Sequence, residues 1–109
     1  MEVFSKMRIS EFQALIKDLY YRKDKKRGVV GTGWWFVEEV GELFDAIKKG
    51  DRDKIKEEFA DVFAWLCSLA NLVDINLEES IQKYALKKVC PKCSKNPCEC
   101  KEPEFFLKK

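Results

Sequence analysis

Five acidic residues form two short groups whose spacing suits a metal site. The groups are Glu38, Glu39 and Glu42, followed by Glu58 and Asp61. Residues three apart on a helix share one face, with Cβ atoms about 5–6 Å apart. Carboxylate oxygens are the ligands that hard divalent cations such as Mg²⁺ or Mn²⁺ prefer. The chain has no histidine, so it lacks the Glu-x-x-His pairs of carboxylate di-iron bundles, and redox chemistry is not expected.

A turn at Gly50 would bring the two groups to the same height. Glu42 and Glu58 each lie eight residues from Gly50. Glu39 and Asp61 each lie eleven residues from it. With a rise of 1.5 Å per residue, both pairs would stand roughly 12–17 Å from the turn. We therefore expect these four carboxylates to face one point between two antiparallel helices.

A solvated acidic face is the alternative to a metal site. It predicts a lysine or arginine one helical turn from each carboxylate. Asp45 has such partners in Lys48 and Lys49, and Glu58 has Lys54 one turn back. The other four acidic residues have no basic residue one turn downstream. Because so much uncompensated charge is unfavourable unless a cation offsets it, the metal site is the better interpretation.

The first element expected to support this site is a helix that begins at a capping box. Ser10 and Gln13 have the spacing of that box, and apolar residues follow at helical intervals. This helix is expected to end near Tyr21 or Arg22. The next stretch, residues 22–33, holds five basic residues and three glycines, a composition that predicts a loop.

Three further helices are expected, over residues 32–49, 51–73 and 76–85. Their predicted caps are Thr32, then Asp51 or Asp53, and then Asn76 with Glu79, while Gly50 ends the second helix. No segment alternates polar and apolar residues with a period of two. The predicted fold class is therefore all-α, a bundle of four helices joined by short connections.

The two acidic groups resemble the signature of the MazG-type nucleotide pyrophosphohydrolases, Glu-Glu-x-x-Glu followed by Glu-x-x-Asp. EEVGEL (38–43) matches the first element, and EEFADVFAWLCSLAN (57–71) contains the second. The resemblance covers about residues 10–88 and implies a four-helix MazG-like fold. It also implies a Mg²⁺ site and a water that Glu38 orients or deprotonates, although a merely solvated Glu38 is the alternative. The implied Mg²⁺ ligands are Glu39, Glu42, Glu58 and Asp61.

This resemblance implies both a reaction and an assembly. A nucleoside triphosphate would be hydrolysed between its α- and β-phosphates, giving a monophosphate and pyrophosphate. Phosphoribosyl-ATP is an alternative substrate for the same fold. Because such enzymes are usually dimers or tetramers, a homodimer or homotetramer is expected.

The segment before the first glutamates departs from the family pattern. Better-known MazG proteins carry Trp-Asp-x-x-Gln-Thr there, whereas this chain has Lys23 in place of tryptophan, Asp24, and Arg27 and Gly28 in place of Gln-Thr. The nucleotide preference therefore stays open. The basic side chains of Arg22, Lys23 and Arg27 are candidates for binding the triphosphate, with a solvated basic loop as the equal alternative.

Three more residues are candidates for contacting substrate. A nucleobase can stack on an aromatic ring, which makes Trp34 and Trp65 candidates, although aromatic residues more often pack in a core or an oligomer interface. Lys83 follows the third predicted helix, where the family often has a phosphate-binding lysine. Lysine is also the commonest residue in the stretch that follows, so this last signal is weak.

Four cysteines near the end of the chain predict a second metal site. Cys90, Cys93, Cys98 and Cys100 have the pattern C-x₂-C-x₄-C-x-C. This spacing suits a structural zinc ion, and two disulfides are the alternative. We expect a helical domain over residues 1–88 followed by a zinc-binding tail over residues 89–109. Cys67 lies among apolar residues and is expected to be an ordinary buried cysteine.

Composition bounds the remaining possibilities. Hydrophobic residues make up 46% and charged residues 37% of the 109 residues, which indicates a folded protein. No apolar run is long enough to cross a bilayer, so we expect a cytoplasmic protein with no membrane partner. The last 27 residues are basic, and a non-catalytic zinc-bearing adaptor that binds nucleic acid or protein through them is the alternative function. Nucleic-acid binding is not the favoured interpretation, because metal-bound thiolates would cancel part of that charge.

Overall fold

The computed structural model describes residues 4–103, and within them all regular structure is helical. Helix α1 spans Ile9–Lys49, α2 spans Arg52–Leu72, α3 spans Leu77–Ser80 and α4 spans Gln82–Ala85. The chain divides into two compact units after Glu78, closer to the N-terminus than the boundary after residue 88 expected from sequence. α1 and α2 belong to the first unit, and each unit is described separately.

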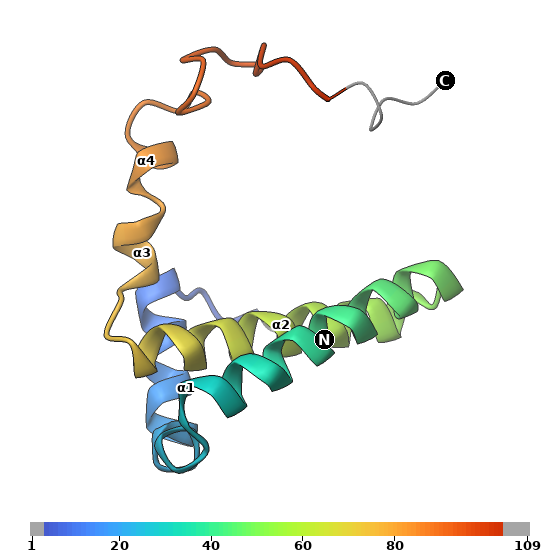
Figure 1. Ribbon diagram of the computed structural model, residues 1–109, viewed down its shortest axis with the longest axis vertical. Helices are drawn as coiled ribbons and strands as arrows, with labels where there is room; N and C mark the ends of the chain where they lie inside the picture. The colour runs from blue at the N-terminus through green and yellow to red at the C-terminus, as the bar shows by residue number, and fades with distance from the viewer. Residues whose placement is uncertain (1–3, 104–109) are drawn as a thin grey trace. The chain divides into compact units, whose positions relative to one another are not determined.

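The C-terminal part of α1 and the whole of α2 form an antiparallel hairpin (Figure 1). Gly50 ends α1 with a left-handed conformation (φ 77°, ψ 14°), and its N–H donates to the carbonyl of Ala46 at 3.0 Å. Asp51 then caps α2, because its carboxylate accepts a hydrogen bond from the N–H of Lys54 at 3.2 Å. The predicted turn at Gly50 and the predicted cap at Asp51 are both confirmed.

The predicted loop over residues 22–33 is wrong. α1 continues through this stretch and is interrupted only at Gly28, whose φ of 82° and ψ of 171° lie outside the helical region. Such a conformation is essentially restricted to glycine. Thr32, the predicted N-cap of a separate helix, is instead fully buried inside α1.

The predicted start of the first helix also needs correction. α1 begins at Ile9, and the carboxylate of Glu11 accepts a hydrogen bond from the N–H of Arg8 at 2.8 Å. Ser10 and Gln13, which were expected to form a capping box, make long-range contacts instead. The hydroxyl of Ser10, for example, donates to Glu78 at 3.1 Å.

Gln13 ties the first part of α1 to the C-terminal end of α2. Its buried amide nitrogen donates to the side-chain oxygen of Asn71 at 3.0 Å and to the carbonyl of Ile75 at 2.7 Å. Its amide oxygen accepts from the N–H of Leu77 at 2.8 Å. The bond from Leu77 satisfies the first N–H of α3, which that helix leaves unpaired.

The fourth predicted helix consists of two single turns. Asn76 caps α3 as expected, since its side-chain oxygen accepts from the N–H of Glu78 at 2.9 Å. The helix does not continue into α4, which is a separate turn. The described residues therefore contain three long helical stretches, namely the two parts of α1 and α2, rather than four.

The core of the first unit is small and partly polar. Its buried apolar residues are Ile16, Ala46, Cys67 and Ala70, and its buried polar residues are Gln13, Asp24, Thr32, Glu58, Ser68 and Asn71. Large apolar residues on both helices of the hairpin are exposed, among them Phe44 and Phe59. Among the described residues of the first unit, nothing covers these side chains.

Among the described residues, no single helix is both long enough and apolar enough to span a membrane. Only the bent pair of Arg52–Leu72 and Leu77–Ala85 reaches that length and composition jointly.

Candidate active site

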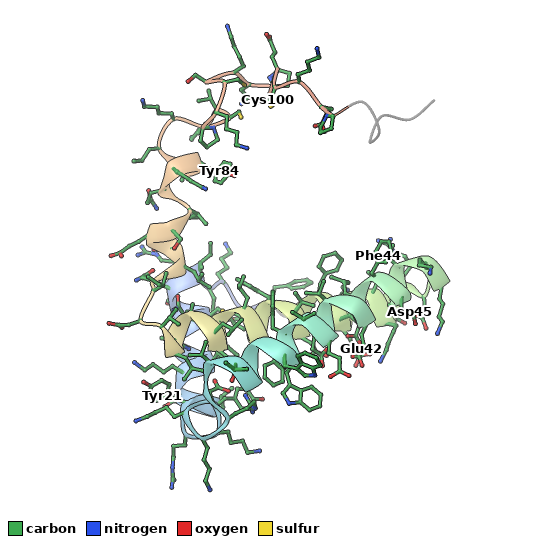
Figure 2. The ribbon with its side chains drawn as sticks, in the orientation of Figure 1. Tyr21, Glu42, Phe44, Asp45, Tyr84 and Cys100 are labelled. Carbon is green, nitrogen blue, oxygen red and sulfur yellow. The ribbon has the colours of Figure 1, made fainter. Side chains whose placement is uncertain are left out.

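Carboxylates from both helices of the hairpin converge. Glu39 of α1 and Glu58 and Asp61 of α2 each place one oxygen within 4.8 Å of the other two. Glu42 lies close enough to Glu39 for its charge to raise the pKa of Glu39, and Figure 2 labels Glu42 among the acidic side chains of the hairpin. The structure thus brings together three of the four side chains that the register about Gly50 selects, with Glu42 nearby, and the role of all four as metal ligands stays a prediction.

Burial and mutual repulsion make this cluster electrostatically unusual. Burial, reinforced by the charges of Glu42, Glu58 and Asp61, raises the pKa of Glu39 to about 7. Glu58 is only 3% exposed. One oxygen of Glu39 and one of Glu58 are buried without a hydrogen-bond partner. An unsatisfied buried carboxylate oxygen is unfavourable, and a cation bound between these oxygens would offset that cost.

The ion pairs near the cluster distinguish the solvated Asp45 from the predicted metal ligand Glu58. Lys54 pairs with the outer oxygen of Glu58 at 3.2 Å. Lys49 pairs with Asp45 at 3.0 Å, so Asp45 has the basic partner expected for a solvated residue. Lys54 engages only one of the two Glu58 oxygens, and the second is the buried, unpartnered atom.

A cavity of about 290 Å³ adjoins Asp61. Its lining residues are Tyr20, Lys23, Asp24, Arg27, Asp61, Ala64, Trp65 and Ser68. Two predicted phosphate-binding residues, Lys23 and Arg27, therefore share this cavity with a predicted metal ligand and with Trp65. The cavity combines positive charge, an aromatic ring and a carboxylate at one edge, which suits an anionic aromatic molecule.

Arg27 is held rigidly at this cavity. Its Nη1 donates to the carboxylate of Asp24 at 2.9 Å and to the hydroxyl of Thr32 at 3.2 Å. Its guanidinium lies 4.8 Å from the ring centre of Trp65, a cation–π distance. Gly31 makes room for this arrangement, since a Cβ atom there would lie 2.7 Å from Cγ of Arg27.

The remaining predicted residues are more scattered. Arg22 lines a different surface hollow, together with Lys17 and Lys25. Trp34 is 74% exposed, and its neighbour Trp35 is the residue that stacks on Trp65, with ring centres 6.1 Å apart.

Two other predicted residues lie in separate surroundings. Glu38 is exposed and lines an open hollow of about 460 Å³ with Glu42 and Glu58. Lys83 belongs to the C-terminal unit, where its ammonium lies 5.3 Å from the ring centre of Tyr84. The structure therefore does not relate Lys83 to the carboxylates.

Sequence reasoning missed the residues that position Arg27. Asp24 is 1% exposed and has one buried oxygen without a hydrogen-bond partner. Thr32 and Ser68 are buried at the same site. The spacing of Asp24 and Arg27, three residues apart, could have suggested their ion pair. Nothing in the sequence indicated that Thr32 would turn inward to the same guanidinium.

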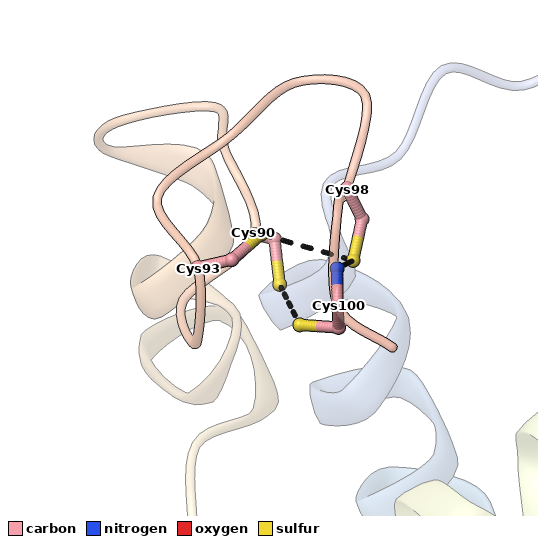
Figure 3. A group of neighbouring side chains, drawn as sticks. All are labelled: Cys90, Cys93, Cys98 and Cys100. Atoms are coloured by element: carbon pink, nitrogen blue, oxygen red, sulfur yellow. Dashed lines mark hydrogen bonds between the residues drawn. The ribbon is translucent and has the colours of Figure 1, made fainter. Parts of the chain in front are cut away.

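A second cluster lies in the C-terminal unit. The sulfur atoms of Cys90, Cys93, Cys98 and Cys100 all lie within 4.8 Å of one another (Figure 3). Four cysteines in this arrangement could hold a metal ion. Cys67, in contrast, is fully buried in α2, where burial raises its pKa to about 11, as expected for an inert core cysteine.

Comparison with known families agrees with this geometry. The MazG nucleotide pyrophosphohydrolase domain matches residues 32–94, more than half of the chain and all five acidic residues of the two groups. The chain therefore belongs to the MazG nucleotide pyrophosphohydrolase family, whose class of activity is the hydrolysis of nucleotide pyrophosphate bonds. Comparison with curated proteins found no match.

Proposed function

We propose that this protein is a Mg²⁺-dependent nucleoside triphosphate pyrophosphohydrolase that cleaves between the α- and β-phosphates. The observation that carries the proposal is the convergence of Glu39, Glu58 and Asp61 around two buried, unpartnered oxygens. An acidic face used only for solubility would be exposed to water and paired with lysines.

The carboxylate cluster fits a hard divalent cation. All of its donors are oxygens, and two of them have no other partner. Glu39, Glu42, Glu58 and Asp61 would hold Mg²⁺ or Mn²⁺. When bound, the ion would offset phosphate charge and lower the pKa of an attacking water.

Glu38 is the residue to which we assign the proton of that water. Its side chain is exposed and lines the same hollow as Glu42 and Glu58. A carboxylate within reach of a bound water can act as the general base that accepts its proton. This role requires the water to lie on the side of the cluster that faces the hollow.

The Asp61 cavity suits the nucleotide. Arg27 offers a guanidinium oriented by Asp24, and such a group binds phosphate oxygens through two parallel hydrogen bonds. Lys23 adds a second positive charge at the same cavity. The ring of Trp65 provides a surface for the base. Arg22, Trp34 and Lys83 have weaker support, because none of them lines this cavity.

A second copy of the chain is the partner that we propose for the exposed apolar face. Val37, Val40, Phe44 and Ile47 follow one another at helical spacing on α1 and are all exposed. On α2, Phe59, Phe63 and Leu66 do the same. Figure 2 shows Phe44 on the side of α1 away from Glu42 and Asp45. Pairing through this face would cover apolar surface and leave the carboxylates accessible.

A cytoplasmic location belongs to the same proposal. Nucleoside triphosphates and reduced thiols occur together in that compartment. The cysteine cluster has no chemical part in the reaction, because soft thiolates are not ligands for Mg²⁺.

Product analysis tests the proposed function. Purified protein with Mg²⁺ would be given each ribo- and deoxyribonucleoside triphosphate and, separately, phosphoribosyl-ATP. The expected products from a triphosphate are the monophosphate and pyrophosphate in equal amounts, with no reaction in the presence of EDTA. A diphosphate with orthophosphate, or no turnover of any triphosphate, would overturn the proposal. In the second case, turnover of phosphoribosyl-ATP would point to biosynthetic use of the same fold.

A further inference from the structure

We infer that Cys90, Cys93, Cys98 and Cys100 bind one zinc ion as a closed tetrathiolate, and that this ion folds the C-terminal unit. This inference goes beyond the hydrolase function, because the cysteines belong to the second unit and the carboxylate cluster belongs to the first. It rests on the geometry of the sulfur atoms, on their hydrogen bonds and on the burial of the unit.

The distances between sulfur atoms fit a tetrahedron around zinc. Sγ of Cys90 lies 3.8 Å from Sγ of Cys100, and Sγ of Cys93 lies 3.8 Å from Sγ of Cys98. Four sulfurs at the usual Zn–S distance of about 2.3 Å stand about 3.8 Å apart at the corners of a tetrahedron. A disulfide would instead bring two sulfurs to about 2.05 Å, and all four cysteines are free thiols.

The backbone shapes the segment around these sulfurs. The N–H of Glu99 donates to Sγ of Cys93, and the N–H of Cys100 donates to Sγ of Cys98, each at 3.3 Å. Bonds of this kind stabilise thiolate charge. The N–H of Cys90 also donates to the carbonyl of Lys95 at 2.9 Å, which closes the turn that carries the first two cysteines.

In the described part of the C-terminal unit, residues 79–103, no residue is buried, so these residues form no core. A segment without a core usually needs a metal ion or a cross-link to fold. Lys88, Lys92 and Lys95 line a surface hollow with Cys90 and Cys98, so positive charge surrounds a centre whose four thiolates and one Zn²⁺ sum to −2.

Ligand type and number fit a zinc ion in a structural role. Four sulfur ligands in tetrahedral arrangement are typical of zinc or iron, and hard cations such as Mg²⁺ disfavour them. With all four positions filled by protein, the ion has no open site for water or substrate. The zinc therefore holds the chain together and takes no part in a reaction.

Metal analysis of the full-length protein tests this inference. We expect one zinc ion per chain after purification under reducing conditions, and five free thiols in denaturant with chelator, matching the five cysteines of the sequence. The double variant Cys93→Ser/Cys98→Ser should lose at least tenfold in zinc content. Cys67→Ala, which removes a thiol outside the cluster, should keep one zinc. Bound iron, absence of metal in the wild type, or fewer than five thiols would overturn the inference.

Limited proteolysis tests the role in folding. Chelation should increase trypsin cleavage at the lysines of residues 79–103 severalfold, and added Zn²⁺ should reverse it. Far-UV circular dichroism of the same samples should retain the helical signal of α1 and α2, which shows that the rest of the chain remains folded. Cleavage that does not respond to chelation would contradict a zinc-folded unit.

Discussion

At the scale of single residues, Glu39 is the side chain whose protonation reports on the whole carboxylate cluster. Its pKa is about 7, raised first by burial and then by the charges of Glu42, Glu58 and Asp61. Between about pH 4.5 and 7, and without a cation, the folded protein thus keeps a proton on Glu39 that the unfolded chain releases. A divalent cation that binds among these oxygens competes with that proton.

The first prediction is a pH dependence of stability without divalent cation. The contribution of Glu39 is fully present below about pH 4.5, the pKa of an unperturbed glutamate, and is lost as the pH rises through about 7. In EDTA, the melting temperature of the wild type relative to Glu39→Gln should therefore fall across this range. Thermal melts at half-unit pH steps measure the difference. A difference that grows with pH would mean that the pKa of Glu39 is lowered rather than raised.

The second prediction concerns Glu58. Glu58→Gln removes one anionic ligand while keeping the size of a buried side chain, so Mg²⁺ should bind on the order of 10-fold more weakly or worse. Asp45→Asn is the matched control, because Asp45 is paired with Lys49 and should not contribute. Calorimetric titration measures the Mg²⁺ affinity of both variants. Equal affinities in wild type and Glu58→Gln would remove Glu58 from the site.

At the scale of elements, the break in α1 at Gly28 separates two helical segments that pack in different directions (Figure 1). The segment before the break carries Lys23, Asp24 and Arg27 to the cavity beside Asp61. The segment after it carries the first carboxylates. Gly28 thus allows one helix to supply two different parts of the site.

The third prediction follows from this conformation. Gly28→Ala should lower the free energy of unfolding by about 1–3 kcal/mol, because a side chain is not tolerated at a φ of 82° with an extended ψ. Gly41→Ala is the control, since Gly41 is helical and a Cβ there meets no atom within 4 Å. The free energy of unfolding of Gly41→Ala should rise by about 0.5–1 kcal/mol. Denaturant unfolding measures the free energy of unfolding of the wild type and both variants. An unchanged value in Gly28→Ala would show that α1 can straighten.

The register of the hairpin could be predicted from the sequence, whereas the helical structure of residues 22–33 could not. The carboxylate register was predictable because Gly50 and Asp51 are strong local signals and equal residue counts on two helices give equal heights. The loop over residues 22–33 was predicted wrongly because two of its three glycines serve packing, while Gly28 alone interrupts the helix. Gly31 accommodates Arg27, and a Cβ on Gly33 would be in contact with Leu69. Such tertiary reasons leave no periodic trace in the sequence.

At the scale of the whole molecule, the described residues of the first unit leave an apolar face of the α1–α2 hairpin uncovered. Phe44 is 64% exposed, and its neighbours at helical spacing are exposed as well. Several large apolar side chains on one helix face are unusual for a soluble monomer. The buried core, in contrast, is small and contains several polar residues. The stability of the hairpin is therefore expected to depend on association.

The fourth prediction is that the wild type is a dimer or larger, and that Phe44→Asp shifts it to a monomer of 12.8 kDa. A charge in a buried apolar interface is strongly unfavourable. Leu86→Asp, at an equally exposed apolar residue of the C-terminal unit, should leave the mass unchanged. Sedimentation equilibrium measures all three proteins. A monomeric wild type would contradict the proposed pairing.

The central claim is that the converging carboxylates form the site of pyrophosphate hydrolysis. Its most direct test measures Mg²⁺-dependent pyrophosphate release in wild type, Glu42→Gln and Asp45→Asn, using the best substrate from the product analysis. We predict that Asp45→Asn keeps the wild-type rate and that Glu42→Gln loses about 100-fold or more. Wild-type activity in Glu42→Gln, with its fold intact by circular dichroism, would contradict the claim.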